Sequence, residues 1–436
     1  MINTTLCYIE KDNKYLMLLR NIKKNDLNAQ KWIGVGGKFI EGETPSECLI
    51  REIKEETGLT LTAYEYVGLI KFVSDTWEDE DMYLFKGTDF EGELTDNCPE
   101  GTLKWVPSDE VLDLPTWEGD KYFLTPLIEG KRNLNMTVCY EGDKLASFSD
   151  DTCEVVIDQS SIISSPHGFS TRIGGVSEAE YASLNLGMNR GDYPGRVTEN
   201  WRRFLEKVGI SSESDYPFVC GKQVHGNNVH IATMEDARPA YGPGELIEAD
   251  GYVTNVPNLP LAIFTADCVP LLMEDPVSKV VAAIHCGWRS TVADIEGVAI
   301  SKMKSLCSSQ NSFDPSNIHA AIGPAINQCC FEVGEEVIEA VKKLLFERNR
   351  EKEASQEYPL CLEDKPALWF LKDNGKYMLD LRGVVKTRLL QLGLKEENIS
   401  LVGECTMCHP EKYYSHRYSN GARGSLACVI MLPSIE

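Results

Sequence analysis

The first third of the chain contains short apolar and alternating runs that predict β-strands. These runs span residues 4–10, 15–20, 65–73, 82–88 and 102–107. Residues 45–57 instead place their apolar side chains at helical spacing and predict the one strong helix of this region. Two further apolar runs, 136–140 and 145–148, flank a polar turn at 141–143 and predict a closing hairpin.

Beyond residue 155 the pattern changes to a longer alternation of strands and helices. Apolar runs at 261–266 and 280–284 predict buried strands. Three longer segments predict helices: 291–307, 333–350 and 381–392. Gly393 directly follows the last of these and is suited to end a helix. We therefore expect a mixed α/β fold class.

The domain organisation follows from length and from one short polar segment. With 436 residues, the chain is long enough for two or three domains. Apolar residues make up 42% of it, which is ordinary for folded protein and excludes a mainly disordered chain. The polar segment 149–152 separates the two patterns. The predicted domains are residues 1–151 and 155–436.

Net charge and cysteine content limit the partners and the compartment. The net charge of −24 argues against a general nucleic-acid binder, which needs a basic surface. No run of 18 apolar residues predicts a membrane span, and the N-terminus does not resemble a signal peptide. We expect the 15 cysteines to be mostly reduced thiols of a cytoplasmic protein. The sequence predicts no particular oligomeric state.

The predicted helix at 45–57 carries three carboxylates on one face. Glu52, Glu55 and Glu56 stand at positions i, i+3 and i+4, so their like charges repel each other. A cation among them would remove this cost, and oxygen ligands suit Mg²⁺ or Mn²⁺. The alternative is a solvated acidic face, which is the commoner fate of a Glu-rich run.

The complete pattern around this helix resembles the Nudix box. The matching positions are Gly37, Glu43, Arg51-Glu52-Ile53, Glu55-Glu56 and Gly58-Leu59. The resemblance implies an α/β/α sandwich that hydrolyses a nucleoside diphosphate linked to another group, with divalent metal neutralising the phosphoryl oxygens.

The resemblance also implies roles for single residues. The residues that match the family's metal ligands are Gly37 (through its backbone), Glu52, Glu55, Glu56 and, from a loop outside the box, Glu100. The catalytic base is expected among the same glutamates, chiefly Glu55 and Glu56. Arg51 pairs with Glu43 to brace the loop.

Two segments indicate a purine nucleotide as the substrate. Residues 30–38 and 115–120 are similar to those of MutT-like 8-oxo-dGTP diphosphatases. The resemblance implies that Trp117 stacks on the purine and that Asp120 bonds its edge. The alternative for Trp117 is an ordinary core aromatic. Ile33 stands where animal enzymes carry a base-contacting Asn, so base recognition must differ here.

The second half brings two histidines and a cysteine to predicted strand ends. His225 precedes a turn, Cys268 follows the apolar run 261–266, and His285 follows the run 280–284. In open sheets such positions line the ligand crevice. Two His and one Cys make a plausible three-ligand zinc site with one position open. Taken singly, each residue is more often structural.

Ordered motifs across residues 160–436 resemble the YfiH/laccase-domain family. The matching segments are 167–177, 183–187, 221–226, 248–251, 265–270, 283–289, 321–326, 405–406 and 414–417. The resemblance implies a YfiH-like mixed α/β domain in which His225, Cys268 and His285 bind zinc. It further implies phosphorolysis of adenosine, inosine, guanosine and methylthioadenosine, together with deamination of adenosine.

Phosphorolysis needs a phosphate, and three arginines are candidates to hold it. Arg172, Arg289 and Arg417 carry guanidinium groups that bind phosphate bidentately, although a surface salt bridge is the competing role for each. A helix starting near Thr291, directly after Arg289, would add free N–H groups. Asp267, beside Cys268, is expected to orient a ligand or handle a proton.

Several alternatives remain open for this half. The pattern at 405–409 matches haem c attachment, but Cys405-Thr406 belongs to the family motif. An older family label is copper polyphenol oxidase or laccase, which needs more histidines than the seven present. Cys268 and His285 could instead form the dyad of a Cys–His hydrolase. Cys329 and Cys330 are expected to serve ordinary packing. The non-enzyme alternative is a purine sensor with decayed sites.

Overall fold

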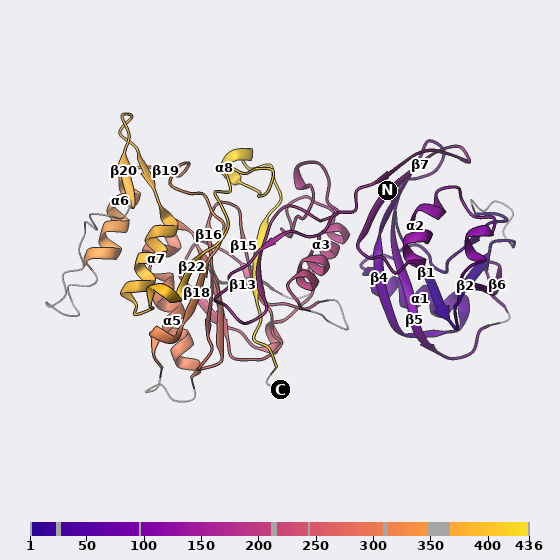
Figure 1. Ribbon diagram of the computed structural model, residues 1–436, viewed down its shortest axis with the longest axis horizontal. Helices are drawn as coiled ribbons and strands as arrows, with labels where there is room; N and C mark the ends of the chain where they lie inside the picture. Colours follow the sequence, from indigo (N-terminus) through magenta and orange to yellow (C-terminus); the bar gives the residue numbers. More distant parts are fainter. Residues whose placement is uncertain are drawn as a thin grey trace. The chain divides into compact units, whose positions relative to one another are not determined.

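The computed structural model describes residues 2–22, 28–95, 97–210, 216–242, 245–307, 313–347 and 367–434. The chain divides into two compact units, Met1–Glu154 and Val155–Glu436. Figure 1 shows the elements of each unit. No helix within the described residues combines the length and the apolar character needed to cross a membrane.

Unit 1 is built on one mixed sheet. Its strands are β1 (Ile2–Lys11), β2 (Lys14–Leu19), β3 (Trp32–Ile33), β4 (Thr60–Ser74), β5 (Glu80–Glu91), β6 (Thr102–Pro107), β7 (Leu134–Glu141) and β8 (Lys144–Asp150). Their order is β3-β2-β1-β5-β4-β7-β8, and β6 pairs with β2. The β1–β5 and β4–β7 pairs are parallel, and the other pairs are antiparallel. Each predicted strand run of this region lies within one of these strands or overlaps it closely.

The helices of unit 1 are α1 (Pro45–Thr57), α2 (Asp120–Ile128) and the short 3₁₀ helix η1 (Val111–Asp113). The predicted bounds of α1 are confirmed, because its end signals are local. Thr44 and Glu47 form a reciprocal capping box, an arrangement worth about 1 kcal/mol, and Gly58 ends the helix in the left-handed region at φ 76°. Buried Leu49 and Ile53 face the sheet side of the helix.

Unit 2 contains two larger and two smaller sheets. Its strands are β9 (Ile157–Asp158), β10 (His167–Ser170), β11 (Gly221–Lys222), β12 (Val229–Ile231), β13 (Ile247–Glu248), β14 (Gly251–Thr254), β15 (Leu261–Thr265), β16 (Val269–Asp275), β17 (Val280–Cys286), β18 (His319–Ile322), β19 (Glu332–Val333), β20 (Trp369–Leu371), β21 (Tyr377–Leu379), β22 (Ile399–Leu401) and β23 (Leu426–Ile430). The six-stranded sheet has the order β12-β14-β17-β16-β18-β22, and the four-stranded sheet has the order β15-β23-β10-β9.

The helices of unit 2 complete a layered arrangement. They are α3 (Pro194–Lys207), α4 (Trp288–Val292), α5 (Ile295–Leu306), α6 (Glu335–Lys342), a π-helical turn (Lys343–Glu347), α7 (Leu381–Gln391) and α8 (His416–Ser419), with 3₁₀ turns at 179–181, 234–236, 315–317 and 396–398. Helices α5, α6 and α7 pack on the six-stranded sheet, and α3 packs on the four-stranded sheet (Figure 1). The two sheets pack on each other through a shared apolar core.

This layering explains the continuous apolar runs of the second half. In β17, Val280, Ala282 and Ile284 belong to the core facing the helices, whereas Val281 and Ala283 belong to the core between the sheets. Successive side chains of a strand point to opposite faces, so a strand covered on both faces must be apolar throughout.

Two predicted helices differ from the structure. The helix predicted at 291–307 is two helices, α4 and α5, because Asp294 between them adopts φ 71°. The segment 333–350 begins as β19, and its helix starts at Glu335; residues 348–350 lie outside the described residues.

Candidate functional site

The three predicted zinc ligands lie in neighbouring turns and strand ends of unit 2. His225 occupies the turn after β11, with φ 60°. Cys268 lies in the turn that leads from β15 in one sheet to β16 in the other. His285 is the sixth residue of β17 and pairs in register with Pro270 of β16. The antiparallel β16–β17 pair therefore carries the cysteine and the second histidine to the same end of the sheet.

The donor atoms of these residues converge. One donor atom from each of the three residues lies within 4.8 Å of the other two. The Nε2 of His225 is 3.8 Å from the Cys268 Sγ. Gly287 borders this space, because a Cβ there would stand 3.0 Å from the His225 ring and 3.5 Å from the Cys268 sulfur. A two-nitrogen, one-sulfur set of this kind suits zinc and leaves a fourth position open.

A buried aspartate orients the set. The Asp250 side chain is fully buried, and its Oδ1 is 2.8 Å from the His285 Nδ1. The same carboxylate accepts the backbone N–H groups of Val224, His225 and Gly226 at 2.8–3.1 Å. Burial would raise the pKa of Asp250, but these donors hold it below its usual range. The carboxylate therefore accepts the Nδ1 proton and leaves His285 Nε2 for the site.

The cysteine of the set is disposed to ionise. Burial alone would raise the pKa of the Cys268 thiol. The charge of His285 and hydrogen bonds from His225 and His285 outweigh this and bring the pKa to about 6. The thiolate is both the metal-binding and the nucleophilic form of cysteine. The lowered pKa of Cys268 is therefore consistent with both the zinc site and the Cys–His dyad.

Asp267 ties the Cys268 turn to two distant segments. Its Oδ1 accepts the Thr406 hydroxyl at 2.7 Å, and its Oδ2 accepts the Arg417 backbone N–H at 2.7 Å. Asp267 itself has φ 89°. With both oxygens engaged in this way, Asp267 acts here as a positioning residue for Cys268 and for the start of α8.

The three candidate anion-binding arginines differ in their surroundings. The Arg172 guanidinium donates to the carbonyls of Ala182 and Pro410 at 2.6–2.8 Å and stacks on Tyr414. It therefore joins segments of the fold. Arg289 and Arg417 are exposed.

The expectation that a helix begins just after Arg289 is wrong. Helix α4 starts at Trp288, so Arg289 lies in its first turn, where its guanidinium stacks 4.3 Å from the Trp288 ring centroid. The buried Thr291 lies near the end of this short helix and not at its start.

In unit 1, Arg51 gathers the carboxylates of α1. It contacts Glu43 through two nitrogens, both at 2.8 Å. It also reaches Glu52 at 2.6 Å and Glu55 at 3.4 Å. The Gly37 Cα lies against the Glu52 carboxylate, because a Cβ there would stand 2.4 Å from its Cδ. Glycine at 37 is thus what permits this close approach.

Glu56 is the buried member of the acidic face. Its carboxylate accepts the Gly36 N–H at 3.3 Å, and burial followed by repulsion from Glu52 raises its pKa to about 7. Arg20 lies 4.0 Å from Glu56 and 2.7 Å from Glu100. Glu52, Glu56 and Glu100 thus share one neighbourhood, whereas the Glu55 side chain is 60% exposed.

Trp117 belongs to the core of unit 1. Its side chain is buried, its Nε1 donates to Asn28 at 2.8 Å, and its ring packs edge-on against Tyr140. The ammonium of Lys31 lies 4.3 Å from the ring centroid. Asp120 accepts the Trp117 N–H at 3.2 Å, and burial raises the pKa of this carboxyl to about 7. A purine could stack on Trp117 only where Lys31 moves aside.

Two protein families match the chain. The NUDIX domain family matches residues 2–127, and the family described as multi-copper polyphenol oxidoreductase laccase matches residues 166–433. The laccase-family model matches more than half of the chain, so the chain belongs to that family, and its N-terminal part matches the NUDIX domain. The NUDIX match lies within unit 1, and the laccase-family match lies within unit 2.

Relatives of the laccase-family domain carry a different functional name. The purine nucleoside phosphorylase YlmD of Geobacillus stearothermophilus is 31% identical over 267 residues, which is 60% of this chain and 88% of that protein. The purine nucleoside phosphorylase YfiH of Escherichia coli is 34% identical over 263 residues, 60% of this chain and 92% of that protein. The crystal structure of the Geobacillus YlmD matches with a TM-score of 0.52 at 28% identity, covering 63% of this chain and 94% of that one.

Two residues of these sites escaped the sequence-based assignment. Asp250 stood in a recognised motif, Glu248-Ala249-Asp250-Gly251, but only the structure shows its contact with His285. Arg20 follows strand β2 with no motif around it. The sequence signal that could have identified Arg20 was its place directly after an apolar strand in a chain rich in acidic residues.

Proposed function

We propose that the chain is a bifunctional purine enzyme, with a nucleotide hydrolase in residues 1–151 and a purine nucleoside phosphorylase in residues 155–436. The observation that carries the second activity is the convergence of His225, Cys268 and His285. It agrees in domain and fold with relatives named purine nucleoside phosphorylase. We infer the same substrates: adenosine, inosine, guanosine and methylthioadenosine, with deamination of adenosine as a side activity.

Zinc is the metal we assign to this site. Two imidazoles and one easily ionised thiol suit Zn²⁺, and Asp250 already holds one ring in the tautomer that a ligand needs. When bound, zinc supplies a Lewis acid that lowers the pKa of coordinated water. Copper chemistry of the laccase type needs several metal centres, and the described residues group no comparable set of histidines.

The surrounding residues support phosphorolysis. Arg289 and Arg417 are the exposed guanidinium groups that we propose hold phosphate, while Arg172 and Asp267 position the segments that carry the site. Phosphate would attack C1′ of the ribose as the glycosidic C–N bond breaks, which yields ribose 1-phosphate and the free base.

In unit 1 we propose Mg²⁺-dependent (or Mn²⁺-dependent) hydrolysis of purine nucleoside triphosphates, with oxidised forms such as 8-oxo-dGTP as preferred substrates. Glu52, Glu56 and Glu100, with Glu55 and the Gly37 carbonyl, would hold the metal. The raised pKa of Glu56 supports this, because a divalent cation would relieve the repulsion that causes it. When bound, the metal neutralises phosphoryl oxygens.

Arg51 would keep the loop in place through its paired contacts with Glu43. Asp120 and Trp117 would contact the base. The cysteines of the described residues are free thiols, which supports a reducing compartment such as the cytoplasm.

The test is incubation of the purified chain with a panel of purine nucleosides and nucleoside triphosphates, with and without phosphate, followed by product mass analysis. We expect nucleoside cleavage to require phosphate and to release ribose 1-phosphate. Cys268→Ala and His285→Ala should each lose the zinc bound at this site and nucleoside activity together. Both should retain nucleotide hydrolysis, because unit 1 carries its own site.

Cys307→Ala is the matched control, since Cys307 lies in unit 2 and its thiol donates to the Met303 carbonyl. It should keep both activities and its zinc. Copper in the purified protein, or full nucleoside activity in metal-free variants, would contradict the zinc assignment. The Cys268–His285 dyad would then be the better explanation.

A further inference from the structure

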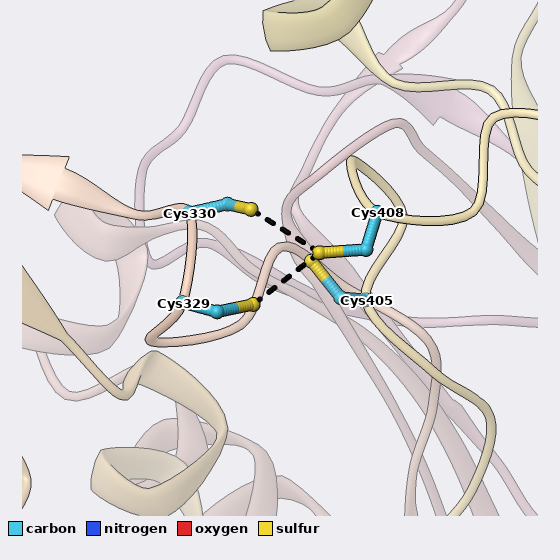
Figure 2. A group of neighbouring side chains, drawn as sticks. All are labelled: Cys329, Cys330, Cys405 and Cys408. Atoms are coloured by element: carbon cyan, nitrogen blue, oxygen red, sulfur yellow. Dashed lines mark hydrogen bonds between the residues drawn. The ribbon is translucent and has the colours of Figure 1, made fainter.

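Four cysteines from two turns meet in unit 2, apart from His225, Cys268 and His285. Cys329 and Cys330 lie in the turn that follows β18, and Cys405 and Cys408 lie in the turn that follows β22 (Figure 2). Cys330 packs against the apolar core, as expected, but both cysteines also lie beside Cys405 and Cys408. Cys329 is exposed, Cys330 is half-buried, and both thiols point towards Cys408.

The fold brings the two turns together. Strands β18 and β22 pair in parallel, so their chains leave the sheet at the same end. The pairing continues beyond the strands as a bridge between Ala325 and Cys405, with a hydrogen bond of 3.0 Å from the Thr406 N–H to the Ala325 carbonyl. The cysteine positions are thus fixed by backbone contacts on both sides.

The sulfur spacing fits one tetrahedral ion. All four Sγ atoms lie within 4.8 Å of one another, and Cys408 stands 3.5 Å from Cys329 and 3.4 Å from Cys330. Zn–S bonds of ~2.3 Å in a tetrahedron place the sulfurs ~3.8 Å apart. A disulfide would join only two of the four, at ~2.05 Å.

The backbone around Cys405 is arranged for a negatively charged sulfur. The Asn327 N–H donates to the Cys405 Sγ at 3.4 Å, and the N–H groups of Met407 and Cys408 also bond it. Met407 and Cys408 lie two and three residues after Cys405, so the Cys-x-x-Cys turn itself places their N–H groups against the Cys405 sulfur. Such donors stabilise a thiolate, which is the form that binds metal.

We propose that Cys329, Cys330, Cys405 and Cys408 bind one zinc ion in a closed site of four thiolates. Four protein ligands leave no position for substrate, which is the arrangement of structural zinc. The ion would join the two turns that hold Asp267 beside Cys268. One turn is preceded by Ile326, whose N–H bonds the Asp267 carbonyl at 3.0 Å, and the other contains Thr406, which bonds its carboxylate.

The first test compares zinc content among full-length chains purified without oxygen. Cys408→Ser and Cys329→Ser should each carry about one zinc fewer per chain than the unaltered protein. Cys307→Ser, the matched control, should lose none. Because the result is a difference between variants, it holds whether or not His225, Cys268 and His285 bind zinc. Equal zinc content in all four proteins would overturn the proposal.

The second test needs no cysteine variant and so does not depend on the variants folding. Cobalt replaces zinc in the His285→Ala chain, which removes one ligand of the other site and leaves these cysteines intact. We expect the absorption of tetrahedral cobalt bound by four thiolates. Absence of that spectrum, or mass analysis showing these cysteines joined as disulfides in the anaerobically purified chain, would overturn the proposal.

Discussion

The Asp250 carboxylate accepts a hydrogen bond from the His285 ring at 2.8 Å, and the same oxygen accepts the backbone N–H of His225 at 2.9 Å. One buried oxygen therefore fixes the ring of one proposed ligand and the backbone of another. We therefore expect Asp250 to position the proposed metal site.

Asp250→Asn should weaken zinc binding. An amide can accept through one oxygen only, and its NH₂ group would face backbone N–H donors. We expect zinc affinity to fall about 10- to 100-fold, measured by competition with a chromogenic chelator. Asp275→Asn is the control, because Asp275 is equally buried at the other end of β16 and caps a turn through Val277 and Ser278. Equal affinity in both variants would mean that Asp250 serves the fold alone.

Glu56→Gln should cut nucleotide hydrolysis by orders of magnitude and leave unit 1 folded. Removing this charge relieves the repulsion from Glu52 that helps raise the pKa of Glu56 to about 7, so the metal-free protein should lose no stability. Hydrolysis is measured with Mg²⁺ present, and thermal unfolding is measured without it. Glu65→Gln, which loses only a contact with Arg132, should keep full activity. Unchanged hydrolysis in Glu56→Gln would contradict the assignment of this carboxylate.

The sequence predicted those parts of the fold whose signals are local. The bounds of α1 follow from Thr44, Pro45 and Gly58, which lie within one turn of the helix ends. The strand character of β15 and β17 follows from apolar runs of a few residues. In both cases the sequence signal lies within the segment itself, although the strands also pair with distant segments.

The rest depended on pairings between distant segments. Two sheets packed on each other produce the same apolar runs as one sheet between helices, so the sequence carried no separate signal for the layering. The meeting of Cys329 with Cys408 requires the β18–β22 pairing, across 79 positions of sequence. The break between α4 and α5 depends on Asp294, whose carboxylate pairs with Arg388 at 2.7 Å.

Asp120 should make base preference depend on pH. Burial raises the pKa of this carboxyl to about 7, so it is protonated and donates below that pH, and is ionised and accepts above it. A purine with a carbonyl at position six should therefore be favoured at about pH 6, and one with an amino group at about pH 8. We expect the ratio of the kcat/KM values for these two purines to change up to about tenfold between the two pH values. A change of this size corresponds to one hydrogen bond gained or lost.

Two variants distinguish this effect from general pH effects. Asp120→Asn removes the titration, so its ratio of kcat/KM values should be the same at both pH values. Glu118→Gln alters a neighbouring exposed carboxylate, which accepts the Leu145 N–H, and should keep the shift. A ratio that is constant with pH in the unaltered protein would mean that Asp120 does not contact the base.

Glu296→Gln should stabilise unit 2 at neutral and alkaline pH. Glu296 lies in the first turn of α5 and is fully buried; burial, together with repulsion from Asp294, raises its pKa from an ordinary 4.5 to about 8. Between those values the unfolded chain releases the proton and the folded chain keeps it. The stability contributed by the protonated form is therefore complete below pH 4.5 and is lost as pH rises to about 8.

Over that interval the free energy of unfolding of the unaltered chain should fall by about 1.4 kcal/mol per pH unit relative to that of Glu296→Gln. The glutamine has no proton to lose, so its contribution does not change with pH. Urea unfolding of both proteins at each pH measures this, because groups common to both cancel in the difference. Glu248→Gln, altering an exposed partner of Lys222, should follow the unaltered protein throughout. If the difference between Glu296→Gln and the unaltered chain does not change with pH, then Glu296 is already ionised in the folded protein, and a cationic partner must reach it inside the core.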